Sequence, residues 1–365
     1  MNVGLVTLGG LDPSGEERTI PVQRALVARL ARHHDVRVIA LHQPDAPPVF
    51  DLDSAQILVC RRPATLRAVQ RLMREHRRRP FDILHAFWAI RPGMVATWCG
   101  RRLGVPVLVH VAGGELVSLP AQGYGGARSW WGRVLAHYTL RHAALATGAT
   151  APICLAAARW AGRVERVPLG VDLQRWPVCP PRPRMPGPLR LAWVGSINRV
   201  KGPDVLVAVV TELVRRRVDF TLDVVGEDTL DGFLQSRVAS HGLGDRVRVR
   251  GWLRQHELHA MLRGADLLVH TAWHEAGPVV VLEAALVGVP TVGTAVGHVA
   301  EWSPGSAVAV PVGDVGALAR AVEALAADEP RRVALARAAQ TRAVAVDADW
   351  TAERFLALYR DVVPS

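Results

Sequence analysis

Short apolar runs alternate with amphipathic stretches from the first residues of the chain. In the first half the apolar runs are VGLVTLG, DVRVIAL, QILVC, FDILHAFW and VPVLVHVAG, and a typical amphipathic stretch is VQRALVARLARH. Apolar runs bounded by turn residues predict buried strands, and helical spacing of apolar residues predicts covering helices. Strands and helices in turn predict parallel strands joined by crossover helices. The first half is therefore predicted to be an open, doubly wound α/β domain.

The second half repeats this alternation. The runs LRLAWVG, FTLDVVG, RVRVRGW, ADLLVHTA and PTVGTA predict strands, whereas VLVAVVTELVRR, ELHAMLRG and PVVVLEAALVG predict helices. The last stretch, DWTAERFLALYRDVV, predicts an amphipathic helix with Trp350, Phe355, Leu356 and Tyr359 on one side. We expect this helix to pack back toward the first domain.

A proline-rich segment separates the two halves. WPVCPPRPRMPGP, Trp176 to Pro188, contains six prolines, and proline interrupts both helices and central strands. With 365 residues the chain also exceeds what one core normally holds. The predicted organisation is a first domain at 1–176, a linker at 177–188, a second domain at 189–345 and a C-terminal helix at 346–365.

The amino-acid composition indicates the general class of protein. Hydrophobic residues make up 50% of the chain and charged residues 21%, which favours packed globular domains over disorder. The four cysteines include no close pair of the kind that forms a zinc knuckle or a redox motif; they are Cys60, Cys99, Cys154 and Cys179. The start, MNVGLVTLGG, is typical of a buried strand rather than a signal peptide. We expect a cytoplasmic protein.

Charge is divided unevenly along the chain. Residues 1–180 carry 23 Arg against 12 Asp plus Glu, whereas residues 181–365 are balanced at 21 of each sign. A basic domain can indicate a membrane surface, an acidic lipid-linked acceptor or nucleic acid as partner. Because 43 of the 44 basic residues are arginine, a general preference for arginine explains the charge equally well. The segment RRPATLRAVQRLMREHRRRP leaves peripheral membrane docking as a hypothesis, and no groove-reading motif favours nucleic acid.

The sharpest chemical signal is HEAGPVVVLEA, residues 274–284. Gly277, Pro278 and Val279 are predicted to form a helix N-terminus, because proline is well placed in a first helical turn. The free N–H groups of such a start bind phosphate, and glycine lets the ligand approach. Glu283 falls inside the apolar run VVVLEAAL, where a carboxylate needs a partner. With Glu275 eight residues earlier, this pattern predicts a ligand site.

A second signal is LAWVGSINRVKG, residues 191–202. A buried strand ends at Gly195, and Arg199 and Lys201 flank the entry to the next helix. Two cations at a strand–loop–helix edge indicate an anionic ligand. Lys201 is also the only lysine of the chain.

Weaker signals lie at glycine turns after other strands. Gly9 and Gly10 follow the first strand, and Gly226 ends FTLDVVG; neither turn has the GxGxxG spacing of a dinucleotide-binding dehydrogenase. The pair Asp51 and Asp53 is predicted to lie in a proline-rich loop without further carboxylates, so we expect no metal there.

VHVAGGEL brings His110, Gly113, Gly114 and Glu115 to the end of another strand. Such a position faces a ligand crevice in doubly wound sheets. A single histidine at a strand end is often a structural group instead, so both interpretations of His110 stay open.

Taken together, these motifs resemble family 4 glycosyltransferases of the GT-B fold over nearly the whole chain. The landmarks are PLGVDLQRW, GSINRVKG, VRVRGW, and the Glu275-x7-Glu283 pair followed by EAALVGVPTVGTAVGHVAEW. The resemblance implies an α/β protein with two Rossmann-like domains facing a central cleft. It also implies a nucleotide-sugar donor on the second domain, an acceptor on the first, and transfer with retention without a cofactor or metal.

The resemblance also implies roles for individual residues. Glu283 would hold the ribose hydroxyls and Glu275 would lie beside the donor sugar, while Arg199 and Lys201 would neutralise the leaving diphosphate. The further donor-site residues are Gly195, Ser196, Gly226, Trp252, Leu253, Gly277, Pro278 and Val279, and the acceptor-side residues are Gly9, Gly10, Gly113, Gly114 and Glu115. Glu301 fits the acid that closes the family motif.

Two positions depart from the family pattern. Ser196 stands where an arginine usually follows the glycine, and Ala112 stands where a histidine usually precedes Gly-x-Glu, with His110 two residues earlier. The predicted catalytic set is Glu275, His110, Arg199 and Lys201, and no protein nucleophile is evident. The expected function is retaining glycosyl transfer to a sugar or lipid-linked acceptor. The alternatives are a sugar phosphorylase, a nucleotide-sugar epimerase, or a non-catalytic module that binds anions or membranes.

Overall fold

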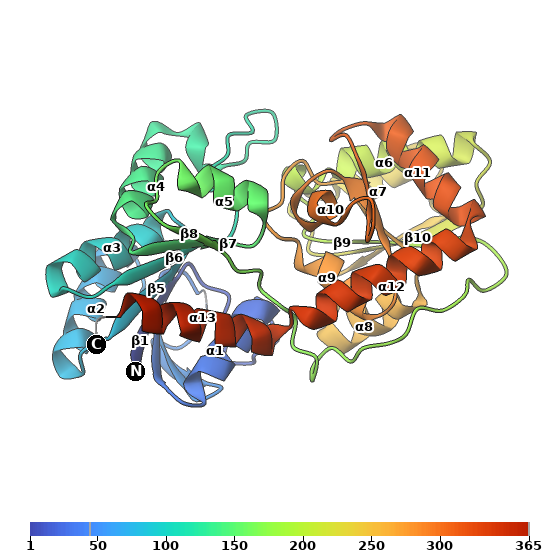
Figure 1. The fold of residues 1–365 in the computed structure, drawn as a ribbon. Coiled ribbons are helices and arrows are strands. Elements are labelled where there is room, and N and C mark those ends of the chain that lie inside the picture. The colour runs from blue at the N-terminus through green and yellow to red at the C-terminus, as the bar shows by residue number, and fades with distance from the viewer. Residues whose placement is uncertain (44, 364–365) are drawn as a thin grey trace. The chain divides into compact units, whose positions relative to one another are not determined.

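The structure is a computed structural model that describes residues 1–43 and 45–363 (Figure 1). The chain forms two compact units. Unit 1 contains Met1–Asp172 and the chain from Val346 onward, and unit 2 contains Leu173–Ala345. The C-terminal helix therefore belongs to the same unit as the N-terminus.

Unit 1 is built on an eight-stranded sheet in the order β3-β4-β2-β1-β5-β6-β7-β8. All neighbouring strands pair in parallel except β3 and β4. The strands are β1 (Asn2–Thr7), β2 (Asp35–Ala40), β3 (Val49–Leu52), β4 (Ala55–Val59), β5 (Ile83–Phe87), β6 (Val107–Val111), β7 (Leu145–Gly148) and β8 (Val164–Arg166). The helices are α1 (Pro21–Ala31), α2 (Ala64–Arg78), α3 (Arg91–Leu103), α4 (Trp130–His142), α5 (Ala151–Ala158) and α13 (Ala348–Val362), with a short 3-10 helix η1 (Gly126–Arg128).

The central strands are apolar almost throughout because helices cover both faces of the sheet. Every residue of β5 and β6 is buried. Helix α13 supplies Phe355 and Tyr359, both fully buried, to the core of unit 1. The Tyr359 hydroxyl lies 2.6 Å from Nδ1 of His85 on β5, so the buried hydroxyl of Tyr359 has a partner.

Arg29 of α1 fastens α13 to unit 1. Its side chain is only 4% exposed. Nε donates to Asp349 at 2.7 Å and one terminal nitrogen donates to Asp172 at 3.1 Å. Nearby, the Thr351 hydroxyl donates to the carbonyl of Pro168 at 3.0 Å. These bonds hold together the places where the chain leaves unit 1 and returns to it.

Unit 2 has a six-stranded parallel sheet in the order β11-β10-β9-β12-β13-β14. Its strands are β9 (Leu189–Val194), β10 (Phe220–Val225), β11 (Val247–Gly251), β12 (Leu267–His270), β13 (Thr291–Thr294) and β14 (Val308–Val310). Its helices are α6 (Pro203–Arg215), α7 (Phe233–Ser240), α8 (Gln255–Gly264), α9 (Val279–Leu286), α10 (Gly297–Trp302), α11 (Val315–Ala327) and α12 (Glu329–Ala345), with a short 3-10 helix η2 (Arg199–Lys201).

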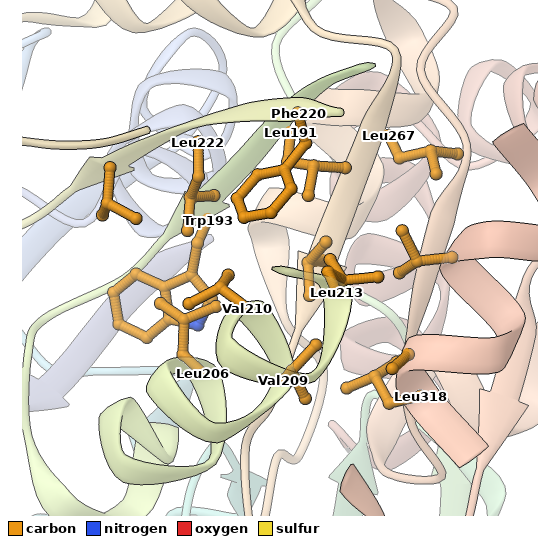
Figure 2. Packing of buried hydrophobic residues seen from close by; sticks show 14 of the residues in the cluster. Leu191, Trp193, Leu206, Val209, Val210, Leu213, Phe220, Leu222, Leu267 and Leu318 are labelled. Carbon is orange, nitrogen blue, oxygen red and sulfur yellow. The ribbon is translucent and has the colours of Figure 1, made fainter. Parts of the chain in front are cut away.

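The core of unit 2 lies between this sheet and helices α6 and α11. Trp193 and Phe220, both 2% exposed or less, project from the strands toward Leu206 and Val210 of α6 (Figure 2). The indole nitrogen of Trp193 donates to the Thr271 hydroxyl at 2.9 Å. The apolar packing therefore ends at a polar contact beside the last residues of β12.

The proline-rich segment lies along unit 2. Arg332, 2% exposed, donates to the carbonyl of Arg182 at 2.6 Å, and Arg182 donates to the carbonyl of Gly264 at 2.7 Å. The fully buried Trp176 donates its indole N–H to the carbonyl of Glu283 at 2.9 Å. Hydrogen bonds from helices α8, α9 and α12 thus replace the ladder bonds that prolines cannot make.

The Asp51–Asp53 region differs from the loop that the sequence predicted. Asp51 lies in β3, which pairs antiparallel with β4, and Asp53 accepts two hydrogen bonds from Arg24, at 2.6 and 3.0 Å. A four-residue edge strand buries only Leu52, so it lacks the apolar run that identifies the central strands.

Of the helices in the described residues, none is both long and apolar enough to cross a membrane.

We predict that Arg29→Met destabilises unit 1 by about 3 kcal/mol, because it breaks a buried ion-pair network by removing the guanidinium that donates to both Asp172 and Asp349. Urea unfolding followed by circular dichroism would measure this loss as an earlier first transition. Arg32→Met is the matched control, since Arg32 is 52% exposed in its side chain and should change stability by less than about 0.5 kcal/mol. Equal free energies of unfolding for the two variants would contradict the proposed role of Arg29 in holding α13 to the rest of unit 1.

Candidate active site

The turn after β9 holds Lys201 in a fixed place. Gly202 has a φ of +66°, and a Cβ there would collide with the carbonyl oxygen of Thr271, so only glycine fits. The Thr271 hydroxyl donates to the carbonyl of Lys201 at 2.8 Å, and Asn198 accepts from the Lys201 N–H at 3.2 Å. The backbone of Lys201 is thus tied to the end of β12.

Lys201, Glu275 and His270 form the charged cluster of unit 2. The Lys201 ammonium forms an ion pair with Glu275, and Nε2 of His270 lies 3.4 Å from the same carboxylate oxygen. Burial alone would raise the pKa of Glu275, but the charge of Lys201, followed by His270, outweighs it and lowers this pKa to about 2. Glu275 is therefore a carboxylate at neutral pH and keeps Lys201 in place.

Glu283 has the opposite environment. It lies in α9, is 7% exposed, and burial raises its pKa to about 7. Helix α9 begins at Val279 with Pro278 as N-cap, and no side chain caps it. The structure confirms the predicted helix start to within one residue. A carboxyl group whose burial is not offset by a cation favours a hydrogen-bonding ligand.

Three glycines end the neighbouring strands β9, β10 and β11. A Cβ at Gly226 would collide with the carbonyl of Gly195, and the N–H of Gly226 donates to the carbonyl of Gly251 at 2.9 Å. The next residue, Trp252, is 50% exposed. Loops of this kind at the carboxyl ends of parallel strands are the usual ligand edge of doubly wound sheets.

The two predicted cations of the turn are not equivalent. Lys201 reaches Glu275, whereas Arg199 is exposed and, among the described residues, makes no ion pair. Ser196 is also exposed. On α10, Gly297 packs against Pro278 and Glu275, and the Glu301 carboxylate lies 3.9 Å from Nδ1 of His298. The structure therefore gathers the predicted residues of the second half around one sheet edge.

In unit 1 the Gly9–Gly10 turn contacts the loop after β2. A Cβ at Gly9 would collide with the carbonyl oxygen of His42, and Gly10 has a φ of +88°. Gln43 is 5% exposed and accepts from the N–H of Gly10 at 2.9 Å. Gly9 is required by the close approach of the two loops, and Gly10 by its positive φ and its contact with Ile20.

Glu115 joins the loops after β5 and β6. Its carboxylate accepts from the N–H groups of Ala89, Ala112 and Gly113 at 3.2, 3.0 and 2.7 Å. Burial raises the pKa of Glu115, and these backbone bonds oppose the rise only in part. A Cβ at Gly114 would collide with the ring of Tyr124. Glu115 therefore shapes the loops after β5 and β6 through their backbone.

His110 lies in the core of unit 1. It is 1% exposed, its Nδ1 is 2.9 Å from the Thr147 hydroxyl, and its ring packs edge-on against Phe87 and Phe355. Burial lowers the pKa of His110 to about 3, so the imidazole is neutral. Its part in catalysis stays a prediction, which these contacts do not favour.

Sequence reasoning missed His270 and Thr271, which lie at the end of β12 and position Glu275 and Lys201. The dipeptide HT closing the run ADLLVHT is the only signal, since polar residues at the end of a buried strand point to the ligand edge. It also missed Trp88, a non-glycine residue with a φ of +71° directly after β5. An aromatic residue in that region is an outlier that often marks a functional position.

Comparison with known proteins gives the same picture for both halves. The model of "Glycosyl transferases group 1" matches residues 183–342, and that of "Glycosyl transferase 4-like domain" matches residues 20–167. A glycogen synthase of Mycobacterium tuberculosis is 34% identical over 199 residues, which are 52% of this chain and 48% of that protein. The chain thus spans about half the length of the curated relatives that it matches most strongly.

Solved structures agree in fold over the full chain. Sucrose-phosphate synthase from Thermosynechococcus elongatus superposes with a TM-score of 0.83 at 20% identity and 99% coverage of both chains. Anabaena HepE, solved in complex with UDP-glucose, has a TM-score of 0.76 at 16% identity, with 99% of this chain and 100% of that chain covered.

Together these matches establish the family. The chain belongs to the group 1, family 4 glycosyltransferases, and its two Rossmann-like units have the GT-B fold.

The raised pKa of Glu283 gives a prediction about stability. A carboxyl with a folded pKa near 7 binds a proton that the unfolded chain has lost above about pH 4.5, so its contribution to stability falls as pH rises from 4.5 to 7. Glu283→Gln removes this loss. The free energy of unfolding of the variant, relative to that of wild type, should therefore rise by about 3 kcal/mol between pH 4.5 and pH 8. A stability difference that is independent of pH, measured by urea titration at both values, would show that Glu283 is ionised in the folded protein.

Proposed function

We propose that the protein is a retaining glycosyltransferase that binds a nucleotide-sugar donor on unit 2. The observation that carries this proposal is the cluster of Lys201, Glu275 and His270 beside the uncapped start of α9. It combines a fixed cation, a carboxylate and free backbone N–H groups at one ligand edge. That combination suits a donor with a diphosphate next to a sugar.

The proposed chemistry moves negative charge onto the leaving diphosphate. The bond between the anomeric carbon and the phosphate oxygen breaks while the acceptor hydroxyl attacks the same face, and its proton passes to the leaving phosphate oxygen. Lys201 and the N–H groups at the start of α9 stabilise the developing charge, which is the largest contribution that a preorganised site makes. No side chain acts as nucleophile in this proposal.

Each residue of the cluster has a distinct part in this scheme. Glu275 holds Lys201 in position through their ion pair and accepts a sugar hydroxyl when the donor binds. Glu283 accepts the ribose hydroxyls, which replaces the missing partner of its buried carboxyl group. Arg199 is exposed and makes no ion pair among the described residues. Its side chain can therefore turn toward the phosphates and replace the arginine that the family usually has at the position of Ser196.

The similarity to HepE, whose structure holds UDP-glucose, makes UDP-glucose the first donor to test. We propose that the transfer needs no metal, because side-chain cations and amides supply the positive charge. The acceptor is proposed to be a sugar or a lipid-linked glycan in the cytoplasm. A phosphorylase or an epimerase with the same fold would act on inorganic phosphate or on donor alone, and a non-catalytic module would bind without turnover.

The first test of this function is substitution of the donor site. Lys201→Ala and Glu283→Ala should each weaken donor binding or turnover about tenfold or more, because each removes a charged or hydrogen-bonding contact to the donor. Isothermal titration with UDP and a coupled assay of UDP release would measure both effects. Arg320→Ala and Glu353→Ala, two exposed helix positions, are the matched controls. Wild-type behaviour of both site variants would refute the site assignment.

The second test is a donor screen without added metal. Thermal shift and slow donor hydrolysis with UDP-, GDP-, ADP- and dTDP-sugars should identify one nucleotide, and an excess of EDTA should leave the rate unchanged. A rate that falls with EDTA and returns with Mg²⁺ or Mn²⁺ would overturn the metal-independent mechanism. Release of a sugar phosphate that depends on added phosphate would indicate the phosphorylase instead.

A further inference from the structure

Two stacked tryptophans begin helix α4 on the surface of unit 1. Trp130 and Trp131 are 55% and 59% exposed, and their ring centroids lie 3.7 Å apart. Val134, one turn later, is 46% exposed. Large aromatic side chains seldom stay this exposed in a group unless they contact a partner.

The position of these side chains follows from the topology of unit 1. Helices α2, α3 and α4 each connect two parallel strands, so they run antiparallel to the strands and begin at the carboxyl edge of the sheet. They also pack side by side, α2 on α3 and α3 on α4 (Figure 1). Leu66, 56% exposed, begins α2 as Trp130 begins α4. The exposed apolar residues therefore share the edge that carries the Gly9–Gly10 turn and the loops joined by Glu115.

Charge on these three helices has a single sign at the surface. Residues 83–164 contain eight arginines and one acid, Glu115, which is buried. Helix α2 adds only Glu75, which is also buried. Three of the exposed arginines, Arg67 on α2, Arg91 on α3 and Arg133 on α4, lie in the first turns of the helices and so at the same edge as the tryptophans. The other exposed arginines lie toward the opposite edge of the sheet: Arg74, Arg77 and Arg78 on α2, Arg101 and Arg102 on α3, and Arg141 on α4.

We infer that this edge of unit 1, which we call the α2–α4 edge, docks on an anionic lipid bilayer with Trp130 and Trp131 inserted at its interface. Indole rings are favoured at the level of lipid headgroups, and each arginine near an anionic surface adds attraction. A two-fold contact with a second copy would place the arginines of both copies against each other. The absence of exposed acids on the three helices suits a phosphate-rich surface instead.

This inference deepens the proposed function and rests on it in one respect, the identity of the acceptor. The acceptor-side loops of unit 1 lie at the same sheet edge as the docking residues. An acceptor carried by a membrane lipid would therefore reach these loops without leaving the bilayer surface.

Co-sedimentation with vesicles tests the docking without any donor. The full chain should bind vesicles of phosphatidylcholine with about 30% phosphatidylglycerol at about 0.1 M salt and should bind pure phosphatidylcholine at least tenfold more weakly. The double variant Trp130→Ser and Trp131→Ser should bind anionic vesicles about tenfold more weakly than wild type. Trp252→Ser, an equally exposed tryptophan of unit 2, should bind like wild type.

Three outcomes would overturn the inference. They are a wild-type protein that ignores anionic vesicles, a double variant that binds them as wild type does, and a double variant that instead loses a dimer seen by light scattering. Circular dichroism melting checks that the double variant is folded, which its surface position predicts. Donor hydrolysis is measured separately in solution, so that a failed transferase with intact vesicle binding, or the reverse, shows which proposal is wrong.

Discussion

A parallel sheet that is buried on both faces can offer polar groups to a ligand only at its ends, and this constraint organises both units. The central strands of each sheet are largely apolar, and among the charged side chains that do lie on strands, Arg37 of β2 is paired with Asp35 and Asp223 of β10 with Arg250 of β11. In unit 2 the consequence is a row of loops that carries Gly195 and Lys201 after β9, Gly226 after β10, Trp252 after β11 and Glu275 after β12. In unit 1, Glu115 likewise lies in the loop after β6, where its carboxylate accepts hydrogen bonds from backbone N–H groups.

The two acids of the proposed donor site, Glu275 and Glu283, meet the cost of burial in two different ways. Glu275 is buried beside Lys201 and His270, so it stays ionised and the pair is prearranged. Glu283 is buried without such compensation, so the neutral form is favoured until a ligand supplies hydrogen bonds. The ion pair of Glu275 stabilises the fold around it, whereas the buried carboxyl group of Glu283 lowers stability at neutral pH. Enzymes often have substrate-binding sites whose residues reduce the stability of the folded protein.

The sequence was sufficient for the fold, because the alternating apolar runs and the βα order determine a doubly wound sheet almost alone. It also located the cluster at Glu275 and Glu283, since an acid inside an apolar helix and a Gly-Pro start are visible as letters. The sequence did not predict features that depend on residues far apart in the chain. The pairing of β3 with β4 depends on a single buried residue, Leu52, and the role of His270 depends on a contact across a loop. For His110, strand alternation alone could not say which sheet face would be covered by α13.

The surface of unit 1 needed the structure for a similar reason. The basic composition of the first half is consistent either with a general preference for arginine or with an anionic partner, and the sequence alone does not distinguish these two explanations. What separates them is the distribution. A mere preference for arginine would leave acids scattered among the basic residues, as the balanced charge of unit 2 does, whereas α2, α3 and α4 keep their only acid, Glu75, buried. With Trp130 and Trp131 exposed at the same edge, the positive charge belongs to a surface that has to meet an anionic, partly apolar partner.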